Sequence, residues 1–274
     1  TRRIVHIEKA LALIGAGSLK ERLPPLGSDE IGRLGADVNA MADKLTELEQ
    51  LKKTFVTSVT HELRSPLGVI EGYVSQLLMR STGLSAEDRA ALDRILRNTR
   101  RLGHFVTNLL DLAKIERGKL DFTPLRADPS ELVENTVRFF APKAQESRMT
   151  LISEIEPGLP LVHFDPDLIA HVLTNLISNA LKFTRPGGRI TVSLKSSGKN
   201  LELSVADTGV GIKSEDLPRI FAPFQRVANP LKATGVGLGL AISREIAAMH
   251  KGELGVTSEA GKGSRFCLTL PLDA

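Results

Sequence analysis

A histidine with an acidic neighbour offers the first possible chemistry in this chain, in the run His61-Glu62-Leu63-Arg64-Ser65-Pro66. An exposed imidazole that is partly unprotonated near neutral pH can act as a nucleophile. Glu62 can hydrogen-bond one ring nitrogen and leave the other to attack, and Ser65, four residues on, shares the helix face of His61. A histidine beside a glutamate on a solvated helix is the plainer interpretation of this run taken alone.

Two asparagines and a lysine form the second candidate cluster. Asn175 and Asn179 are four residues apart and therefore share a helix face, and Lys182 follows about one turn later. Amide oxygens can coordinate Mg²⁺ and an ammonium group can meet a phosphate. An asparagine-rich helix surface with no ligand is the alternative.

The third candidate is the run Asp207-Thr208-Gly209-Val210-Gly211-Ile212, which directly follows a predicted strand. A carboxylate at the end of a strand can accept a hydrogen bond from an exocyclic amine such as that of adenine. Gly209 and Gly211 would let a ligand approach the backbone closely. Taken alone, such a loop is more often a simple turn.

A second glycine-rich run, Gly235-Val236-Gly237-Leu238-Gly239-Leu240, opens a predicted helix whose N–H groups suit a phosphate. It superficially matches a dinucleotide-binding fingerprint. That fingerprint needs a strand before it, whereas residues 226–234 are polar, contain Asn-Pro and predict a loop.

The elements that must position these residues differ between the two halves of the chain. After residue 120, helix caps and two-residue alternation predict an α+β sandwich, with helices on one face of a sheet. The predicted helices cover 129–147, 166–181 and 237–249, and the predicted strands cover 150–154, 189–195, 201–206, 253–257 and 264–270.

The first half predicts helices that need partners. Ile4, Ile7, Leu11 and Ile14 form one stripe on a short helix, and a connector with three glycines covers residues 15–28. A long helix then begins at Asp29-Glu30, and its heptad series includes Leu34, Met41 and Leu48. Such a narrow stripe favours a dimeric coiled coil or bundle, and packing within one chain is the alternative.

Pro66 should kink this helix without ending it, because the apolar pattern resumes after it. Ser85 and Asp88 then form a capping box for a third helix, which ends near Gly118. The two long helices predict an antiparallel hairpin, and two such hairpins make a four-helix bundle.

Composition supports this division. Among ten Phe and one Tyr in 274 residues, only Phe55, Tyr73 and Phe105 precede residue 121. The net charge of +4 is spread along the chain and gives no indication of nucleic-acid binding. A single cysteine, Cys267, excludes a disulfide framework, and no apolar run approaches the length of a membrane span.

In this order and spacing the motifs resemble the cytoplasmic part of a bacterial membrane sensor histidine kinase. His61–Leu67 is similar to the H box, Asn175–Phe183 to the N box, and Asp207–Ile212 and Gly235–Leu240 to the two principal glycine boxes. Phe221–Phe224 is similar to the F box and Gly261–Gly263 to a last glycine box. The resemblance implies a HAMP linker at 1–46, a dimerisation and phosphotransfer hairpin at 47–120 and an ATP-binding domain at 121–274.

The resemblance also implies a set of residue roles around ATP and Mg²⁺. Asp207 would bind the adenine amino group, Asn179 the Mg²⁺, and Asn175 and Lys182 the phosphates. Phe183, Gly209, Gly211, Gly235, Gly237, Gly239 and Leu240 would complete the nucleotide site, and Arg226 would contact the γ-phosphate. A lid would cover about 213–234.

In the same resemblance, His61 would take the γ-phosphoryl group with Glu62 as base, and Ser65 would help to position a water for dephosphorylation. The phosphoryl group would pass to an Asp of a response regulator. The chain would be a homodimer without a nucleic-acid partner. It would be the cytoplasmic portion of an inner-membrane protein, anchored through segments that this sequence does not include.

Two alternatives remain at this point. Gyrase-type ATPases share the expected fold, but in that group a glutamate at the place of Asn175 activates water, and an amide cannot act as a base. A non-catalytic pseudokinase that only transmits conformation is the other. Every matched motif is filled by a chemically competent residue, which favours the kinase.

Overall fold

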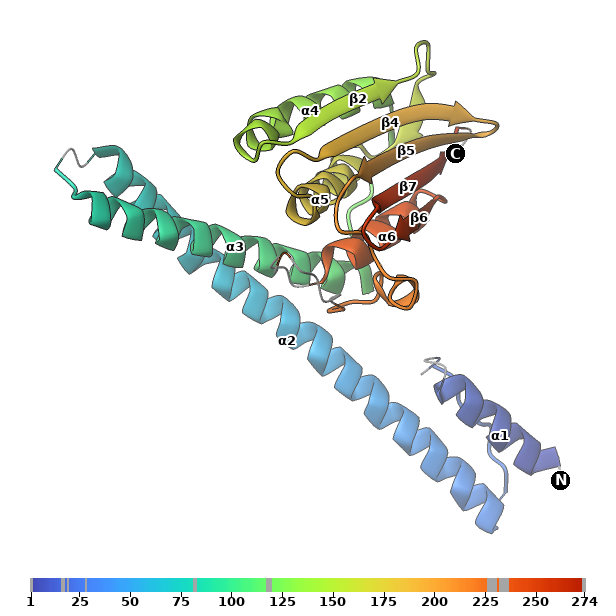
Figure 1. Cartoon of the computed structure of the whole chain (residues 1–274). Helices are drawn as coiled ribbons and strands as arrows, with labels where there is room; N and C mark the ends of the chain where they lie inside the picture. Colours follow the sequence, from blue (N-terminus) through green and yellow to red (C-terminus); the bar gives the residue numbers. More distant parts are fainter. Residues whose placement is uncertain are drawn as a thin grey trace. The chain divides into compact units, whose positions relative to one another are not determined.

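The computed structural model describes residues 2–15, 18, 20–27, 29–80, 83–116, 120–225, 231 and 237–272, without the side chains of 49–58, 61 and 116. The chain divides into two compact units, Thr1–Val106 and Thr107–Ala274 (Figure 1). Each unit is described separately below.

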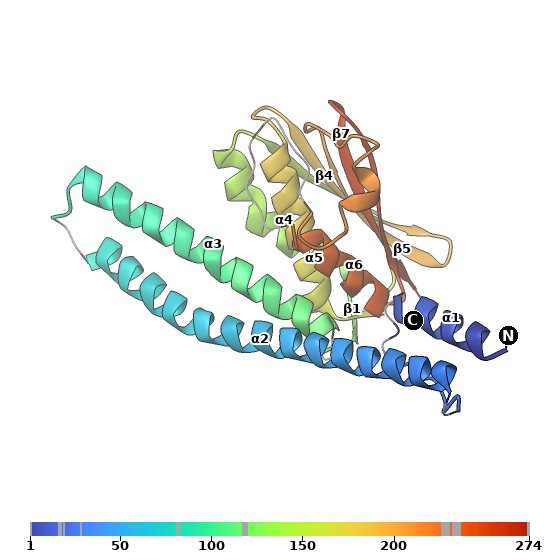
Figure 2. The ribbon, with the colours of Figure 1, turned by 90° about the horizontal axis from the view of Figure 1, so that it is seen from below.

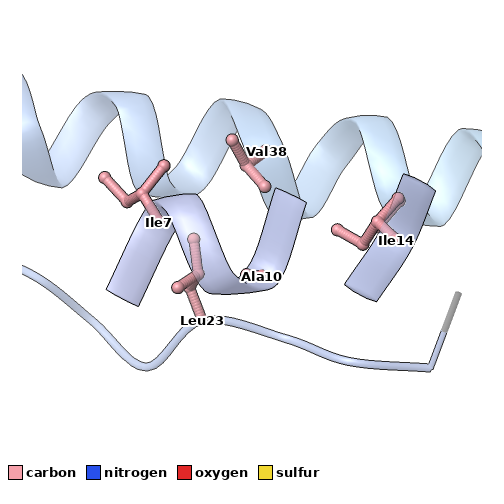
Figure 3. Packing of buried hydrophobic residues seen from close by; sticks show 6 residues of the cluster. Ile7, Ala10, Ile14, Leu23 and Val38 are labelled. Carbon is pink, nitrogen blue, oxygen red and sulfur yellow. The ribbon is translucent and has the colours of Figure 1, made fainter. Parts of the chain in front are cut away.

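The first unit begins with helix α1, Arg2–Gly15. Ile7, Ala10 and Ile14 are buried in a small apolar cluster with Leu23, Val38 and Ala42 (Figure 3). Ile4 and Leu11 of the predicted stripe are exposed, so the prediction of a buried stripe is correct for Ile7 and Ile14 and wrong for Ile4 and Leu11. The buried face follows the spacing 7, 10, 14, which turns Ala10 rather than Leu11 toward the cluster.

Asn39 fixes the connector between α1 and the next helix. Its Oδ1 accepts from the Leu23 N–H at 2.8 Å, and its Nδ2 donates to the Leu23 carbonyl at 2.9 Å. Both backbone polar groups of Leu23 are therefore satisfied while its side chain is buried in the cluster.

Helix α2 runs from Glu30 to Arg80 and passes through Pro66 without ending, as predicted. Asp29 precedes its first turn and accepts from the Gly32 N–H at 3.0 Å. Val38 is buried, whereas Leu34, Met41 and Leu48 of the predicted heptad series are each about half exposed in the single chain.

Helix α3, Ala86–Glu116, begins at the predicted capping box. The Ser85 hydroxyl accepts from the Asp88 N–H at 3.0 Å and donates to the Asp88 carboxylate at 2.7 Å. Within the first unit, α3 runs antiparallel to α2, and Arg100 forms an ion pair with Glu71 at 2.7 Å. The predicted hairpin is confirmed.

The second unit contains a five-stranded sheet in the order β2-β4-β5-β7-β6. β2 and β4 are parallel and the other neighbours are antiparallel. Figure 2 shows α4, α5 and α6 side by side along one face of this sheet. The element bounds are α4 Pro129–Glu146, β2 Thr150–Ile155, α5 Pro166–Phe183, β4 Arg189–Ser197, β5 Asn200–Asp207, η1 Leu217–Arg219, α6 Gly239–Met249, β6 Glu253–Glu259 and β7 Gly263–Pro271.

A second, two-stranded sheet was not predicted. β1, Leu125–Ala127, pairs antiparallel with β3, Val162–Phe164, and each strand has three residues. The core between the helices and the main sheet is aliphatic. Its fully buried side chains include Leu173, Ile177, Leu194, Ile246 and Leu268. The helical layer and the sheet together form the expected α/β sandwich.

Candidate nucleotide site

Helix α5 carries the two predicted asparagines, and their side chains lie next to each other. Asn179 Nδ2 donates to Asn175 Oδ1 at 3.4 Å, and Asn175 Nδ2 donates to Ser243 Oγ on α6 at 2.9 Å. Both ends of the Asn175 amide are therefore engaged by protein. Asn179 uses its nitrogen in this chain, so its Oδ1 is the atom of that amide available to a cation.

The start of α6 fits closely against this pair. A Cβ on Gly239 would overlap the Asn175 side chain, so a larger residue here would displace the Asn175 amide. Helix α6 begins at Gly239 rather than at the predicted Gly237, because Gly237 has a φ of +78° and lies outside the right-handed helical region. Leu240 follows in the first turn and is half-buried.

The loop that begins at Asp207 is tied to the end of α5. The Val210 N–H donates to the Phe183 carbonyl at 3.0 Å, and a Cβ on Gly209 would overlap that carbonyl. The Gly209 N–H donates to Asp207 Oδ1 at 2.8 Å. The helix that carries Asn179 and the loop that carries Asp207 are thus held together at the carboxyl end of the central strand β5.

Burial raises the pKa of the Asp207 carboxyl above its ordinary value of 3.8, although backbone hydrogen bonds from Gly209 and Ser264 act in the opposite direction. A half-buried carboxylate of this kind gains from a ligand donor that replaces lost water. The exocyclic amine of a purine is such a donor.

Two glycines near the ends of β5 and β6 lie against backbone carbonyls and have positive φ values, so neither position accepts a side chain. Gly211 has a φ of +66° and a Cβ there would overlap the Glu259 carbonyl; Gly263 has a φ of +105° and faces the Asp207 carbonyl in the same way. Ser258 Oγ accepts from the Ile212 N–H at 2.8 Å and donates to the Gly263 carbonyl at 2.8 Å. Ser258 thus links the loop Asp207–Ile212 to the last glycine box, Gly261–Gly263.

The segment of the F box contacts the second glycine run. Phe224 has a φ of +63° and its N–H donates to the Gly237 carbonyl at 2.9 Å. The Phe224 side chain is 56% exposed, and Phe183 is half-buried. Arg226, Gly235 and part of the predicted lid, residues 226–230 and 232–234, lie outside the described residues. Lys182 is exposed on the last turn of α5.

The predicted nucleophile lies in the other unit. His61 is part of α2, and its side chain lies outside the described residues, whereas Glu62 and Ser65 are exposed on the same helix. The structure therefore brings together Asn175, Asn179, Asp207 and Gly239 with the Phe183 backbone. The H box belongs to the first unit and is not part of this cluster.

Ser243 and Ser258 were not predicted. Ser243 is 68 residues from its partner Asn175, although its position four residues after Gly239 places it on the same face of α6. Across the described side chains, no group of three or more His, Cys, Asp or Glu could hold a metal ion by itself. Within the described helices, none has both the length and the apolar character needed to cross a bilayer.

Three known domain families match consecutive parts of the chain. Residues 1–47 match the HAMP domain, residues 51–118 match the His Kinase A (phospho-acceptor) domain, and residues 164–274 match the Histidine kinase-, DNA gyrase B-, and HSP90-like ATPase. The phospho-acceptor match includes His61, and the ATPase match includes Asn175, Asn179 and Asp207.

Curated relatives extend the likeness. The chain is 30% identical to the sensor histidine kinase GacS of Pseudomonas protegens, with 98% of this chain and 34% of GacS covered. It is 37% identical to the aerobic respiration control sensor protein ArcB of Escherichia coli, with 83% and 30% covered. The chain thus spans about a third of the length of these relatives.

Solved structures agree with the fold. The crystal structure of full-length ShkA in complex with AMPPNP has a TM-score of 0.68 and 26% identity, covering 81% of this chain and 46% of that one. The Acinetobacter baumannii histidine kinase AdeS has a TM-score of 0.57 and 25% identity, covering 78% and 98%.

Proposed function

The chain belongs to the sensor histidine kinases of two-component systems, with the HAMP, phospho-acceptor and ATPase domains of that family, and from this membership we propose that it transfers the γ-phosphoryl group of ATP to its own His61. We further propose domain bounds of 1–46, 47–120 and 121–274, which the three matched ranges support. The phosphoryl group then passes to an aspartate on the receiver domain of a response regulator.

The hydrogen bond from Val210 to the Phe183 carbonyl carries the nucleotide-site part of this proposal. It places the loop of Asp207 beside the end of the helix that bears Asn179. In the proposed complex Asp207 accepts from the adenine amine, Gly209 and Gly211 admit the base, and Lys182 meets the phosphates. Arg226 contacts the γ-phosphate, and Gly235, Gly237 and Gly239 flank the lid.

Asn179 fits the Mg²⁺ that accompanies ATP. Mg²⁺ prefers oxygen ligands and is usually held by one or two protein groups together with substrate phosphates. Asn179 offers one amide oxygen, and its nitrogen is engaged by Asn175. Bound Mg²⁺ would supply charge neutralisation at the β- and γ-phosphates. In this arrangement Asn175 orients Asn179 and also helps to hold α6 in place, and its contact with the phosphates stays a prediction.

At His61 one imidazole nitrogen forms the bond to γ-phosphorus while the bond from that phosphorus to the bridging oxygen breaks and ADP leaves. Glu62 takes the proton from the other ring nitrogen and stabilises the charge that develops on the ring. Hydrolysis by the ATPase domain alone is disfavoured, because both ends of the Asn175 amide are hydrogen-bonded and neither is a base.

The proposal extends to partners and placement. The phospho-acceptor match favours a homodimer, and the half-exposed heptad residues of α2 offer it a surface. The HAMP match favours the cytoplasmic portion of an inner-membrane protein, anchored by segments outside this chain. Ser65 is proposed to help position a water that dephosphorylates the regulator.

Incubation with γ-labelled ATP and Mg²⁺ tests the central proposal. We expect acid-labile, base-stable label on the intact chain and none on His61→Gln. The matched control is His104→Gln, a histidine exposed on α3, which should keep the label. Absence of label on the intact chain would overturn the proposal and leave a pseudokinase, and label that persists on His61→Gln would overturn the assignment of the residue.

A further inference from the structure

The segment that joins α3 to β1 is held on the second unit by two residues of the ATP-binding domain. The Thr123 N–H donates to Asp165 Oδ2 at 2.8 Å, and the Thr123 hydroxyl reaches the same oxygen at 3.2 Å. The Phe122 ring meets the His250 ring edge-on, with 4.9 Å between the ring centroids. Asp165 immediately precedes α5 and His250 immediately follows α6.

Asp165 and His250 are also bonded to each other. The backbone N–H of Asp165 donates to His250 Nε2 at 3.0 Å, and His250 Nδ1 lies 2.8 Å from the Ile246 carbonyl. These partners require a neutral ring that carries its proton on Nδ1, because only an unprotonated Nε2 can accept. Both residues are buried.

The Asp165 carboxylate serves two purposes at once. Its Oδ1 accepts from the N–H groups of Asp167 and Leu168 and so caps α5, while its Oδ2 holds Thr123. A further contact of this segment, the ion pair of Lys114 with Asp121 at 3.8 Å, is exposed and contributes little. The hold on residues 122–123 therefore depends on the buried pair.

We propose that Asp165 and His250 form a proton-sensitive latch that fixes residues 122–124 on the ATP-binding domain and thereby sets the length of the tether between that domain and the phospho-acceptor helices. This proposal rests on the proposed function. The covalent path from Glu116 to Phe122 can span at most about 20 Å, and the path from Glu116 to Leu125 about 30 Å. Opening the latch lengthens the tether and thereby changes the effective concentration of the domain at His61.

Protonation of His250 would open the latch. A charged ring has donors on both nitrogens, so Nε2–H would then face the Asp165 N–H and the bond would be lost. Among the described residues, the groups that face the ring are Phe122 from the connecting segment, the Ile246 carbonyl from α6 and Asp165, the N-cap of α5, whose carboxylate is the charged group acting on the ring. Burial lowers the pKa of His250 below its ordinary value of 6.5, although Ile246 and Asp165 oppose this effect. The latch is therefore closed at neutral pH and opens in acid.

Hydrogen exchange of the full chain, measured from pH 7.5 down to the lowest pH at which the Val210 amide stays protected, tests the latch. The readout is the protection factor of the Thr123 amide, corrected for intrinsic exchange, relative to that of the Val210 amide, which reports an intact nucleotide loop. We expect this ratio to fall at least tenfold on acidification. His250→Gln, whose amide oxygen can accept at the place of Nε2 but does not titrate, should keep the ratio constant.

Two further variants separate the latch from folding. His250→Leu should lose Thr123 protection at every pH of this range. Thr123→Val, at an exposed position, keeps the N–H but loses the hydroxyl, and should show a partial loss at residue 123 with Val210 unaffected. An unchanged ratio in acid for the wild-type chain, or a pH-dependent ratio in His250→Gln, would overturn the proposal even if His250→Leu does not fold.

Autophosphorylation of the same variants links the latch to activity. We expect the rate at saturating ATP to change about twofold in Thr123→Val, with unchanged ATP affinity. An unchanged rate despite lost Thr123 protection would overturn the link between tether and transfer. If no variant and no wild-type chain is phosphorylated, the proposed function fails, whereas the exchange measurement still decides whether the latch exists.

Discussion

Asn175 on α5 is bonded to Ser243 on α6 across 2.9 Å, and the same amide accepts from Asn179 at 3.4 Å. The residue that leads the N box is therefore shared between two helices of the nucleotide site. The Asn175 amide fixes the orientation of Asn179, and Gly239 packs against the same Asn175 amide.

Replacing Ser243 by alanine should weaken Mg²⁺-ATP binding about fivefold. The change removes one buried hydrogen bond, whose net contribution is about 1 kcal/mol, and releases the Asn175 amide. Isothermal titration calorimetry measures the effect. Ser153→Ala, on an exposed position of β2, is the matched control and should bind as the wild type does; equal affinities of the two variants would contradict the role given to Ser243.

Gly211 and Gly198 provide a matched pair for the first glycine loop. Their φ values are +66° and +63°, but a Cβ at Gly211 overlaps the Glu259 carbonyl while a Cβ at Gly198 meets open space. Gly198→Ala should cost about 1–2 kcal/mol of stability from backbone strain alone and keep nucleotide binding. Gly211→Ala should cost more and abolish binding. Thermal unfolding and titration with ATP compare the two, and equal behaviour would refute the packing argument.

Asp207→Asn should stabilise the fold and weaken ATP binding at the same time. Burial raises the pKa of this carboxyl, so the folded chain binds the proton more tightly than the unfolded chain, and stability falls as pH rises above 3.8. An amide keeps the Gly209 hydrogen bond without the buried charge. Denaturant unfolding at pH 7 should therefore show a higher midpoint for the variant, and a lower midpoint would show that the charge is well solvated.

The stability of the ATP-binding domain should fall as pH falls from about 6.5. Because the pKa of His250 is lowered by folding, the unfolded chain takes up the proton first, and the stabilising contribution is complete only above the unfolded value. Exchange of the central β5 amides at pH 7.5 and 5.5 measures this. His250→Gln should remove this component of the pH dependence. Burial tends to raise the pKa of Asp165, but hydrogen bonds from Thr123 and Leu168 outweigh it and lower that pKa, so Asp165 affects stability only at more acidic pH.

The local signals in the sequence predicted most of this architecture. Asp128-Pro129 and Asp165-Pro166 each begin a helix, with the aspartate as cap and the proline in the first turn, and the β4–β5 hairpin lies where the alternation placed it. These features depend on neighbours in the chain. The β1–β3 sheet escaped prediction because each strand has three residues, too few to show a period.

Long-range contacts explain what the sequence could not supply at the site. The N box and the two glycine boxes are visible as motifs, but the bonds that organise them join Asn175 to Ser243 and Ile212 to Ser258, 68 and 46 residues apart. Serine has no spacing signature that marks such partners. The prediction that α6 begins at Gly237 was wrong for a local reason, because Gly237 has a positive φ that a right-handed helix does not use.

The uninterrupted helix α2 also has a mechanical consequence. Its 51 residues correspond to a shaft roughly 75 Å long, along which a rotation applied near Glu30 is carried toward Arg80. Pro66 has no N–H, so the carbonyl of Glu62 has no donor four residues later. The backbone hydrogen bond that Pro66 removes from α2 is therefore the one at Glu62, the residue next to His61. We therefore expect α2 to bend and twist more easily at this point than where its hydrogen bonds are complete, so that a rotation of the helix would change the orientation of residue 61.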